Sequence, residues 1–420
     1  MREPMKRCIS AAASTGSKVQ EGRADRVTFR QLDQVFEAEG HIAAKLPRES
    51  FDLGGLLAGE TNAVKPLAVP AATNFAAPVD LFADHLQVSS NLTVIWGSVR
   101  LWDETNLLSC DKLSIESATT NAAEQTAIAE GHVMVCHADP DQCLQADRAV
   151  FSKATGTVVF TGQPTWKLSP SEGRADRVTF HRSGDIEATG DVVARVTLAP
   201  QSGAFLNLFP TAPSTNPAPR VIEVFARELK ASERQVSLLG DARVHQSPIN
   251  GSEPHLRCET LDLFFTTNTH RIESMQAQER VLFEQGKPGV TNGPDAYHRL
   301  TASRLTAKCD SLTGALANFV ADQNVVIDAP DTKGQASHAT ADKLTFTQAI
   351  ASGVTNQTIE LTGRPQLTNP QGRLVGDVII WDMVHDRFFT RDYKLNFSAG
   401  TNATPKNFNL DFTKPAKKKK

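Results

Sequence analysis

The chain has 420 residues, with 44 Lys and Arg against 47 Asp and Glu, and a formal net charge of −3. Hydrophobic residues make up 40% and charged residues 22%, a balance that favours a packed core over wholesale disorder. The near-neutral charge argues against a dedicated nucleic-acid binder, which needs a basic face to release counterions. No apolar run approaches the roughly 20 residues of a membrane-spanning helix.

The first twenty residues open with a basic stretch, as a signal peptide does. Their apolar part, CISAAAS at Cys8–Ser14, is too short and weak for the hydrophobic region of an export signal. We therefore expect residues 1–20 to be a disordered N-terminal segment in which no export signal is evident.

Self-comparison then reveals an internal duplication. The peptide EGRADRVTF occurs twice without change, at Glu21–Phe29 and at Glu172–Phe180. Each copy leads into a Pro- and Ala-rich loop, about 46–79 in the first and about 198–219 in the second. The duplication predicts two repeat units, which we place at residues 21–171 and 172–395, followed by a basic disordered tail over 396–420.

A finer repeat alternates within each unit. One half has an Ala-Asp pair before an apolar strand, and the other half has a glycine before an apolar strand. Val178 and Phe180 share one strand face, as do Val192 and Ala194, so the apolar period is two. Asp176 is expected to accept hydrogen bonds at a turn, and each glycine to supply a positive φ. These glycines are Gly40, Gly97, Gly131, Gly162, Gly190, Gly240 and Gly363, and Glu279 and Gln323 replace the glycine in two further copies.

Each strand pair can bury only one face against its neighbours, so a stack of such pairs gives one continuous apolar interior. Val, Ile, Thr and Phe are enriched in the repeated segments, and helix-forming runs with caps are rare. The sequence therefore predicts an all-β fold, elongated and built from repeated antiparallel strand pairs.

The alternating segments resemble the OstA/LptA-like repeat of the lipopolysaccharide-transport system. The segments that carry the resemblance are GRLVGDVIIWD at Gly372–Asp382, IAEGHVMV from Ile128 and FVADQNVVI from Phe319. The likeness covers about residues 21–395. It implies an antiparallel β-jelly-roll, also called a β-taco, in the periplasm. It also implies a groove that holds the acyl chains of lipopolysaccharide, and end strands that pair with other components of the transport system or with a second copy.

The chain departs from that family in its greater length, its two Pro- and Ala-rich loops and its lack of an evident signal or N-terminal membrane helix. Those departures leave open which component of the pathway it represents. The resemblance predicts a transport bridge that shelters lipid between the inner and outer membranes. The alternative is a head-to-tail assembling β-solenoid scaffold without a lipid ligand. The expected groove-lining residues, which in the alternative form a filled core, are Phe29, Val133, Val178, Phe180, Val192, Val325, Ile327, Phe346, Ile379 and Trp381.

The sequence offers little that indicates catalysis. It contains no GxSxG, HExxH, Walker A or GxGxxG motif. Its acidic residues recur at the same places in the repeats, which fits architecture better than one active site. The alternation His137, Asp139, Asp141 could hold a small metal ion, but a polar hairpin turn is the favoured interpretation. We therefore expect no enzyme activity, no cofactor and no metal.

Cys136 and Cys143 flank a turn-like stretch and could face each other across a hairpin. They form a disulfide if the compartment is oxidising, and otherwise remain two buried thiols. The second Pro- and Ala-rich loop contains AFLNLF from Ala204, which could be a short docking element.

Overall fold

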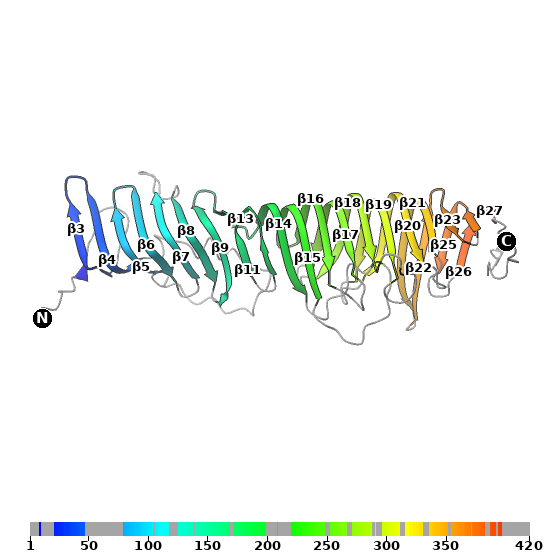
Figure 1. Cartoon of the computed structure of the whole chain (residues 1–420), viewed down its shortest axis with the longest axis horizontal. Helices are drawn as coiled ribbons and strands as arrows, with labels where there is room; N and C mark the ends of the chain where they lie inside the picture. The colour runs from blue at the N-terminus through cyan, green and yellow to red at the C-terminus, as the bar shows by residue number, and fades with distance from the viewer. Residues whose placement is uncertain are drawn as a thin grey trace, which may run out of the picture. The chain divides into compact units, whose positions relative to one another are not determined.

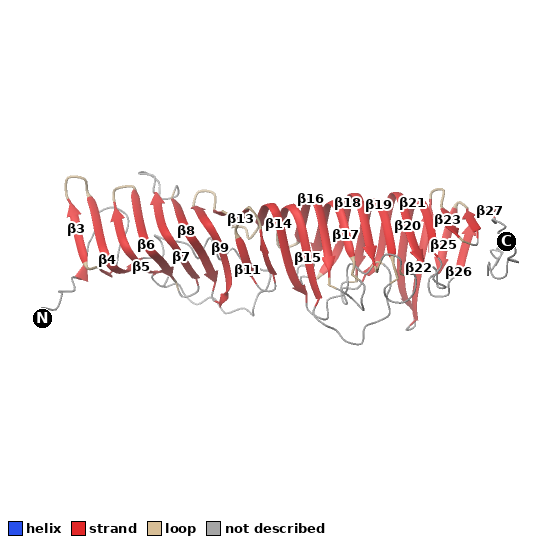
Figure 2. Ribbon diagram, viewed as in Figure 1, coloured by secondary structure: helices blue, strands red, loops and turns tan. Residues whose placement is uncertain are grey.

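The computed structural model describes most of the chain between residues 21 and 396. The described residues are 8–9, 21–46, 79–103, 106–116, 125–137, 139–168, 171–198, 208, 220–247, 253–266, 271–287, 290, 296–310, 316–330, 336–351, 354–370, 372–382, 387–391 and 394–396. All their regular elements are β-strands, so the predicted all-β class is confirmed (Figure 2). In this part of the chain no helix is long and apolar enough to cross a membrane.

The chain divides into two compact units. Unit 1 comprises Met1–Arg195 with Glu228–Glu233, and unit 2 comprises Val196–Arg227 with Arg234–Lys420. The division falls later than the expected boundary between residues 171 and 172. The reason is that the second copy of EGRADRVTF pairs with the strands that precede it, and so continues the first array.

Unit 1 contains fourteen of the described strands, which follow one another in chain order (Figure 1). They are β1 (Cys8–Ile9), β2 (Glu21–Arg23), β3 (Arg26–Arg30), β4 (Val35–Leu46), β5 (Val79–Val88), β6 (Leu92–Trp102), β7 (Asn106–Glu116), β8 (Thr126–His137), β9 (Asp139–Ser152), β10 (Thr157–Thr161), β11 (Thr165–Leu168), β12 (Ser171–Arg174), β13 (Arg177–His181) and β14 (Ile186–Leu198), whose last residues belong to unit 2.

Unit 2 continues the same antiparallel pattern. Its strands are β15 (Arg220–Ala231), of which Glu228–Ala231 belong to unit 1, β16 (Gln235–Gln246), β17 (His255–Phe265), β18 (Ile272–Gln285), β19 (His298–Cys309), β20 (Leu316–Pro330), β21 (Ala336–Ala351), β22 (Val354–Thr362), β23 (Gln366–Asn369), β24 (Gly372–Val375), β25 (Val378–Asp382), β26 (Arg387–Arg391) and β27 (Lys394–Asn396).

Each long strand bends once, at a corner in its middle. In β8, for example, the pairing with β9 is interrupted between Glu130 and Val133, and Gly131 at the interruption has φ +75°. The expected positive φ is therefore present, but the expectation that the glycine precedes the strand is wrong. The bend lets one strand contribute to two walls, and both halves of β8 bury apolar side chains in a common core, Ala129 before the corner and Val133 after it.

The strands of a unit lie one after another in a stack, and we call each level of the stack a rung. In some rungs two short strands take the place of one bent strand. β9 pairs with β10 along its second half and with β11 along its first half. β10 and β11 then pair with β13 and β12 in the same way. The Ala-Asp segments and the glycine segments thus meet at the same corners, where an aspartate of one segment lies against a glycine of the other.

The core follows the period of two predicted for strands. In β8, Val133 and Val135 point inward and are buried, whereas Met134 between them is only half-buried. In unit 1 the buried residues form one cluster that extends from Ala38 in β4 to Val192 in β14. In unit 2, Phe319 and Phe346 stack with ring centroids 5.1 Å apart. Unit 1 therefore has a continuous apolar interior, and unit 2 also buries apolar side chains along its strands.

Candidate functional site: the apolar interior

Most of the residues predicted to line a groove lie in this interior. Val192 is fully buried, and Ile327 is 5% exposed. An exposure of 1% is shared by Val133, Val178, Val325, Phe346 and Ile379. Phe180 is half-buried and packs edge-on against Phe160, with ring centroids 5.9 Å apart. Trp381 is also half-buried and stacks on Phe388 at 5.4 Å.

The members of this set that are at most 5% exposed do not face an open channel, because the protein itself encloses them. At these positions the two walls of each unit leave no space for solvent. Acyl chains can enter only if the walls separate, so that contacts between walls are exchanged for contacts with lipid. The exchange replaces one apolar contact with another, which keeps its net cost small.

Phe29 differs from the other predicted residues, because it is 63% exposed. Its strand β3 pairs only with β4 among the described strands, whereas β13, with the identical sequence, pairs with both β10 and β14. Val27 in β3 still packs against the core, so Phe29 lies on the inward face of an end strand. Phe29 is therefore not buried in the described chain, and its expected place in a lipid groove stays a prediction.

The corners are held by a repeated contact between an aspartate and a glycine. A Cβ atom on Gly190 would lie 2.1 Å from Asp176 Oδ2 and 2.7 Å from Asp176 Cβ. The Asp176 backbone N–H donates to the Gly190 carbonyl oxygen at 2.9 Å. The Asp176 side chain therefore covers the glycine corner, and its expected role as a hydrogen-bond acceptor at a turn stays a prediction.

Two histidines follow corner glycines in unit 1 and bind the same kind of aspartate. His41 Nδ1 donates to Asp25 Oδ2, and His132 Nδ1 to Asp111 Oδ2, each at 2.8 Å. The hydrogen bond and the negative charge of the carboxylate raise the pKa of both histidines. Both side chains are about 90% exposed, so these pairs lie on the solvent side of the corner, outside the apolar interior.

The core also contains a few polar side chains that the sequence pattern did not predict. The buried polar residues are Asp103, Asn106, Gln246 and Gln285. In unit 1, Asp103 Oδ1 accepts hydrogen bonds from the Asn106 backbone N–H at 2.6 Å and side-chain amide at 3.1 Å. The His137 Nδ1–H donates to Asn106 Oδ1 at 2.8 Å. Polar residues at inward positions of the period-two pattern were the signal that could have identified them.

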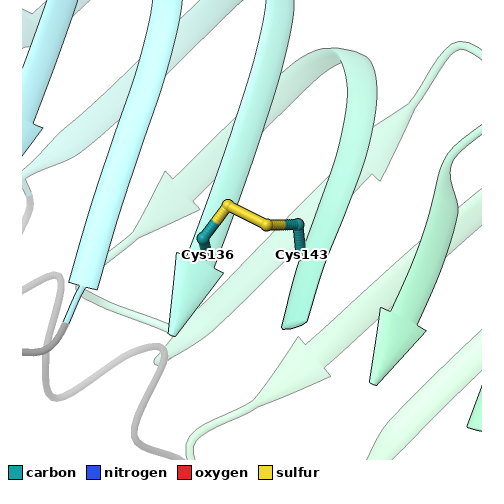
Figure 3. The surroundings of a disulfide bond; sticks show 2 residues. All are labelled: Cys136 and Cys143. Atoms are coloured by element: carbon teal, nitrogen blue, oxygen red, sulfur yellow. A yellow bond between two sulfur atoms is a disulfide. The ribbon is translucent and has the colours of Figure 1, made fainter. Parts of the chain in front are cut away.

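The structure forms the disulfide between Cys136 and Cys143, which lie opposite each other at the ends of β8 and β9 (Figure 3). Cys110, Cys258 and Cys309 are free. Burial raises the pKa of the Cys110 and Cys258 thiols to about 12 and that of Cys309 to about 11. These thiols stay protonated at neutral pH and are poor nucleophiles.

Within the described ranges, no group of three or more His, Cys, Asp or Glu side chains is placed to hold a metal ion. His137 instead binds Asn106, and the side chains of Asp139 and Asp141 lie outside the described residues. The docking element proposed for the second loop is described only at Leu208, which is buried.

A scan against protein-family models and a search of curated proteins found no match for this chain.

Proposed function

We propose that this protein is a periplasmic lipid-binding bridge that shelters the acyl chains of lipopolysaccharide between the two walls of its β-units. The observation that carries the proposal is the single apolar cluster that extends through successive rungs of unit 1. The resemblance to the OstA/LptA-like repeat supplies the lipid class. The disulfide supports the location, because disulfides persist in oxidising compartments such as the periplasm.

The energetics of lipid entry favour such a role. An acyl chain of about a dozen methylenes gains roughly 10 kcal/mol when it leaves water for an apolar site. Because successive rungs present similar inward residues, a chain can move along a unit without meeting one deep energy minimum. The protein has no covalent chemistry in this proposal, so directed movement depends on a partner that supplies energy.

The end strand β3 supports the partner part of the proposal. The outer edge of β3 has no strand partner within the described chain, and Phe29 on β3 and Leu32 in the following turn are strongly exposed. An unpaired edge with exposed apolar side chains is a template for an added strand. The internal copy shows what such an addition does, because Phe180 on the same sequence is covered once β10 is in place. We therefore propose that another pathway component or a second copy pairs with this edge.

The alternative function is a β-scaffold that assembles without a ligand. The close packing of the walls favours it, since Phe283, Phe319 and Phe346 are almost completely inaccessible to solvent. The two functions differ in whether the interior ever contains lipid.

Mass spectrometry of lipids extracted from the protein separates them. The protein is purified from the periplasm of a Gram-negative host, and a sample unfolded in urea, washed and refolded serves as the blank. The bridge function predicts lipid A-like species in the native sample at amounts comparable to the protein and none in the blank. Native protein without such species would favour the scaffold.

A further inference from the structure

Unit 2 has a row of inward polar positions that the apolar interior does not explain. Gln246, the last residue of β16, is 3% exposed, and Gln285, the last residue of β18, is 2% exposed. Gln246 points inward because it follows the buried Ala242 and Val244 at intervals of two residues, whereas Arg243 and His245 between them are not buried.

The strand registers place these residues in one row, which we call the rim row: Gln246, Pro254, Gln285 and His298. The Gln246 backbone N–H donates to the Pro254 carbonyl oxygen at 3.1 Å. His255 lies opposite Glu284, so Pro254 lies beside Gln285, and Gln285 lies opposite His298. Adjacent members are therefore about 5 Å apart, the spacing between neighbouring strands.

The side-chain amide of Gln246 has no hydrogen-bond partner among the described residues, at either Nε2 or Oε1. An unpaired buried amide is costly, so native structures rarely retain one without a reason. The corresponding position in unit 1 is Asp103, six residues after the corner glycine Gly97 as Gln246 is six after Gly240. There the polar groups bind one another, through Asn106 and then His137.

The surroundings of the rim row match the junction between an acyl chain and its headgroup. Two positions further into the core along each strand, the next inward side chain is apolar and buried. These side chains are Val244, Leu256, Phe283 and Leu300. The row itself carries no charge at neutral pH, because burial lowers the pKa of His298 to about 4. A neutral group that both donates and accepts hydrogen bonds, next to an alkyl chain, fits these residues better than a phosphate or a carboxylate does.

The geometry points to a binding subsite at the rim row of unit 2, in which the Gln246 amide binds the neutral amide linkage of an N-acylated amphiphile. The alkyl chain then lies along Val244, Leu256, Phe283 and Leu300. This inference rests on the proposed lipid-binding function and names the part of the lipid that unit 2 recognises. The Gln246 Nε2 donates to the ligand carbonyl oxygen, and Gln246 Oε1 accepts from the ligand N–H.

The test compares two probes with the same chain length, N-dodecanoylglucosamine and dodecyl glucoside, below their critical micelle concentrations. Binding to the full chain is measured by isothermal titration calorimetry. We expect the wild type to bind the amide probe more tightly than the glucoside probe. Gln246→Leu should weaken binding of the amide probe about tenfold, the effect of losing its hydrogen bonds, and leave binding of the glucoside probe unchanged. Gln276→Leu on β18, at a position that faces away from the core, is the matched control and should change neither affinity.

Unfolding in urea gives a second measurement on the same variants. Gln246→Leu should raise the urea midpoint, since it removes an unpaired buried amide. If both probes bind and Gln246→Leu changes neither affinity, the subsite is refuted while lipid binding stands. A lowered urea midpoint with unchanged affinities would show that water satisfies the amide, which also refutes the subsite. If the wild type binds neither probe, the lipid-binding function fails and the subsite with it.

Discussion

The corner glycines provide a quantitative test of how the strands turn from one wall to the other. Gly190 has φ +78°, and a non-glycine residue in this region costs about 1–2 kcal/mol. A Cβ on Gly190 would also lie within 2.7 Å of Asp176 Cβ, an atom that rotation of the Asp176 side chain does not move away. Relief of that overlap requires a shift of the backbone, which adds about 1–3 kcal/mol. Gly190→Ala should therefore lower the free energy of unfolding by about 2–5 kcal/mol.

Equilibrium unfolding in urea, followed by far-ultraviolet circular dichroism, measures the loss, and hydrogen exchange of the β13 amides locates it. Gly156→Ala is the matched control. Gly156 has φ +61°, but its Cβ would approach no closer than 3.1 Å to Arg182 Cβ, so we expect a loss of only about 1–2 kcal/mol. In an Asp176→Gly background, Gly190→Ala should also cost only about 1–2 kcal/mol, because the overlapping side chain is gone. Equal losses for Gly190→Ala and Gly156→Ala would refute the role of the Asp176 contact.

Three further predictions concern the disulfide, a corner histidine and the end strand. Cys143→Ser should lower the free energy of unfolding by about 2–3 kcal/mol, as expected for loss of a bridge with a sequence separation of 7, and dithiothreitol should then no longer shift the melting temperature of the variant. The pKa of His41 should exceed its ordinary value of about 6.5, because the hydrogen bond and charge of Asp25 favour the protonated imidazole. The His41–Asp25 pair should therefore stabilise the fold fully below pH 6.5, and this stabilisation should be lost as the pH rises through the raised pKa. Asp25→Asn should abolish the upward shift of the His41 pKa in an NMR titration. Phe29→Glu should reduce self-association of the protein in sedimentation velocity. Phe82→Glu, at another exposed site within the sheet, is the control and should leave self-association unchanged. Equal effects of the two variants on self-association would exclude docking at the β3 edge.

The sequence predicts the all-β class and the corners because both depend on local patterns. Alternation of apolar residues gives the strands, and the positive φ at each corner glycine follows from its place between two apolar halves. Even Glu279 and Gln323, which replace the glycine, adopt φ +60° and +64°. The local pattern does not show that the glycine lies within a bent strand, because that depends on how both halves pair with neighbouring strands.

Phe29 and Phe180 show most clearly the limit of a local pattern. They occupy the same position in an identical nonapeptide, yet Phe29 is largely exposed and Phe180 packs against Phe160. The difference comes from β10, which pairs with β13 and has no counterpart beside β3 in the described chain. Burial at an end strand depends on whether another strand packs beside it in space, and a repeat alone does not supply that information.

The sequence pattern did not predict the buried polar residues Asp103 and Gln246, for a related reason. Asp103 and Gln246 each end an apolar alternation, where a polar residue normally marks the start of a solvent-exposed loop. Their burial depends on neighbouring strands that are far apart in the sequence. In unit 1 the partner His137 is contributed by β8, 31 residues after Asn106.

Photo-crosslinking in a Gram-negative host tests the lipid-bridge proposal most directly. A benzophenone amino acid replaces Phe180 in unit 1 or Phe346 in unit 2, both on the inward face, and replaces Phe82 on the outward face as the matched control. If acyl chains pass between the walls, both inward probes form adducts with lipopolysaccharide after irradiation and the Phe82 probe does not. Folded variants whose inward probes yield no lipopolysaccharide adduct would contradict the proposal and leave a filled β-scaffold as the function.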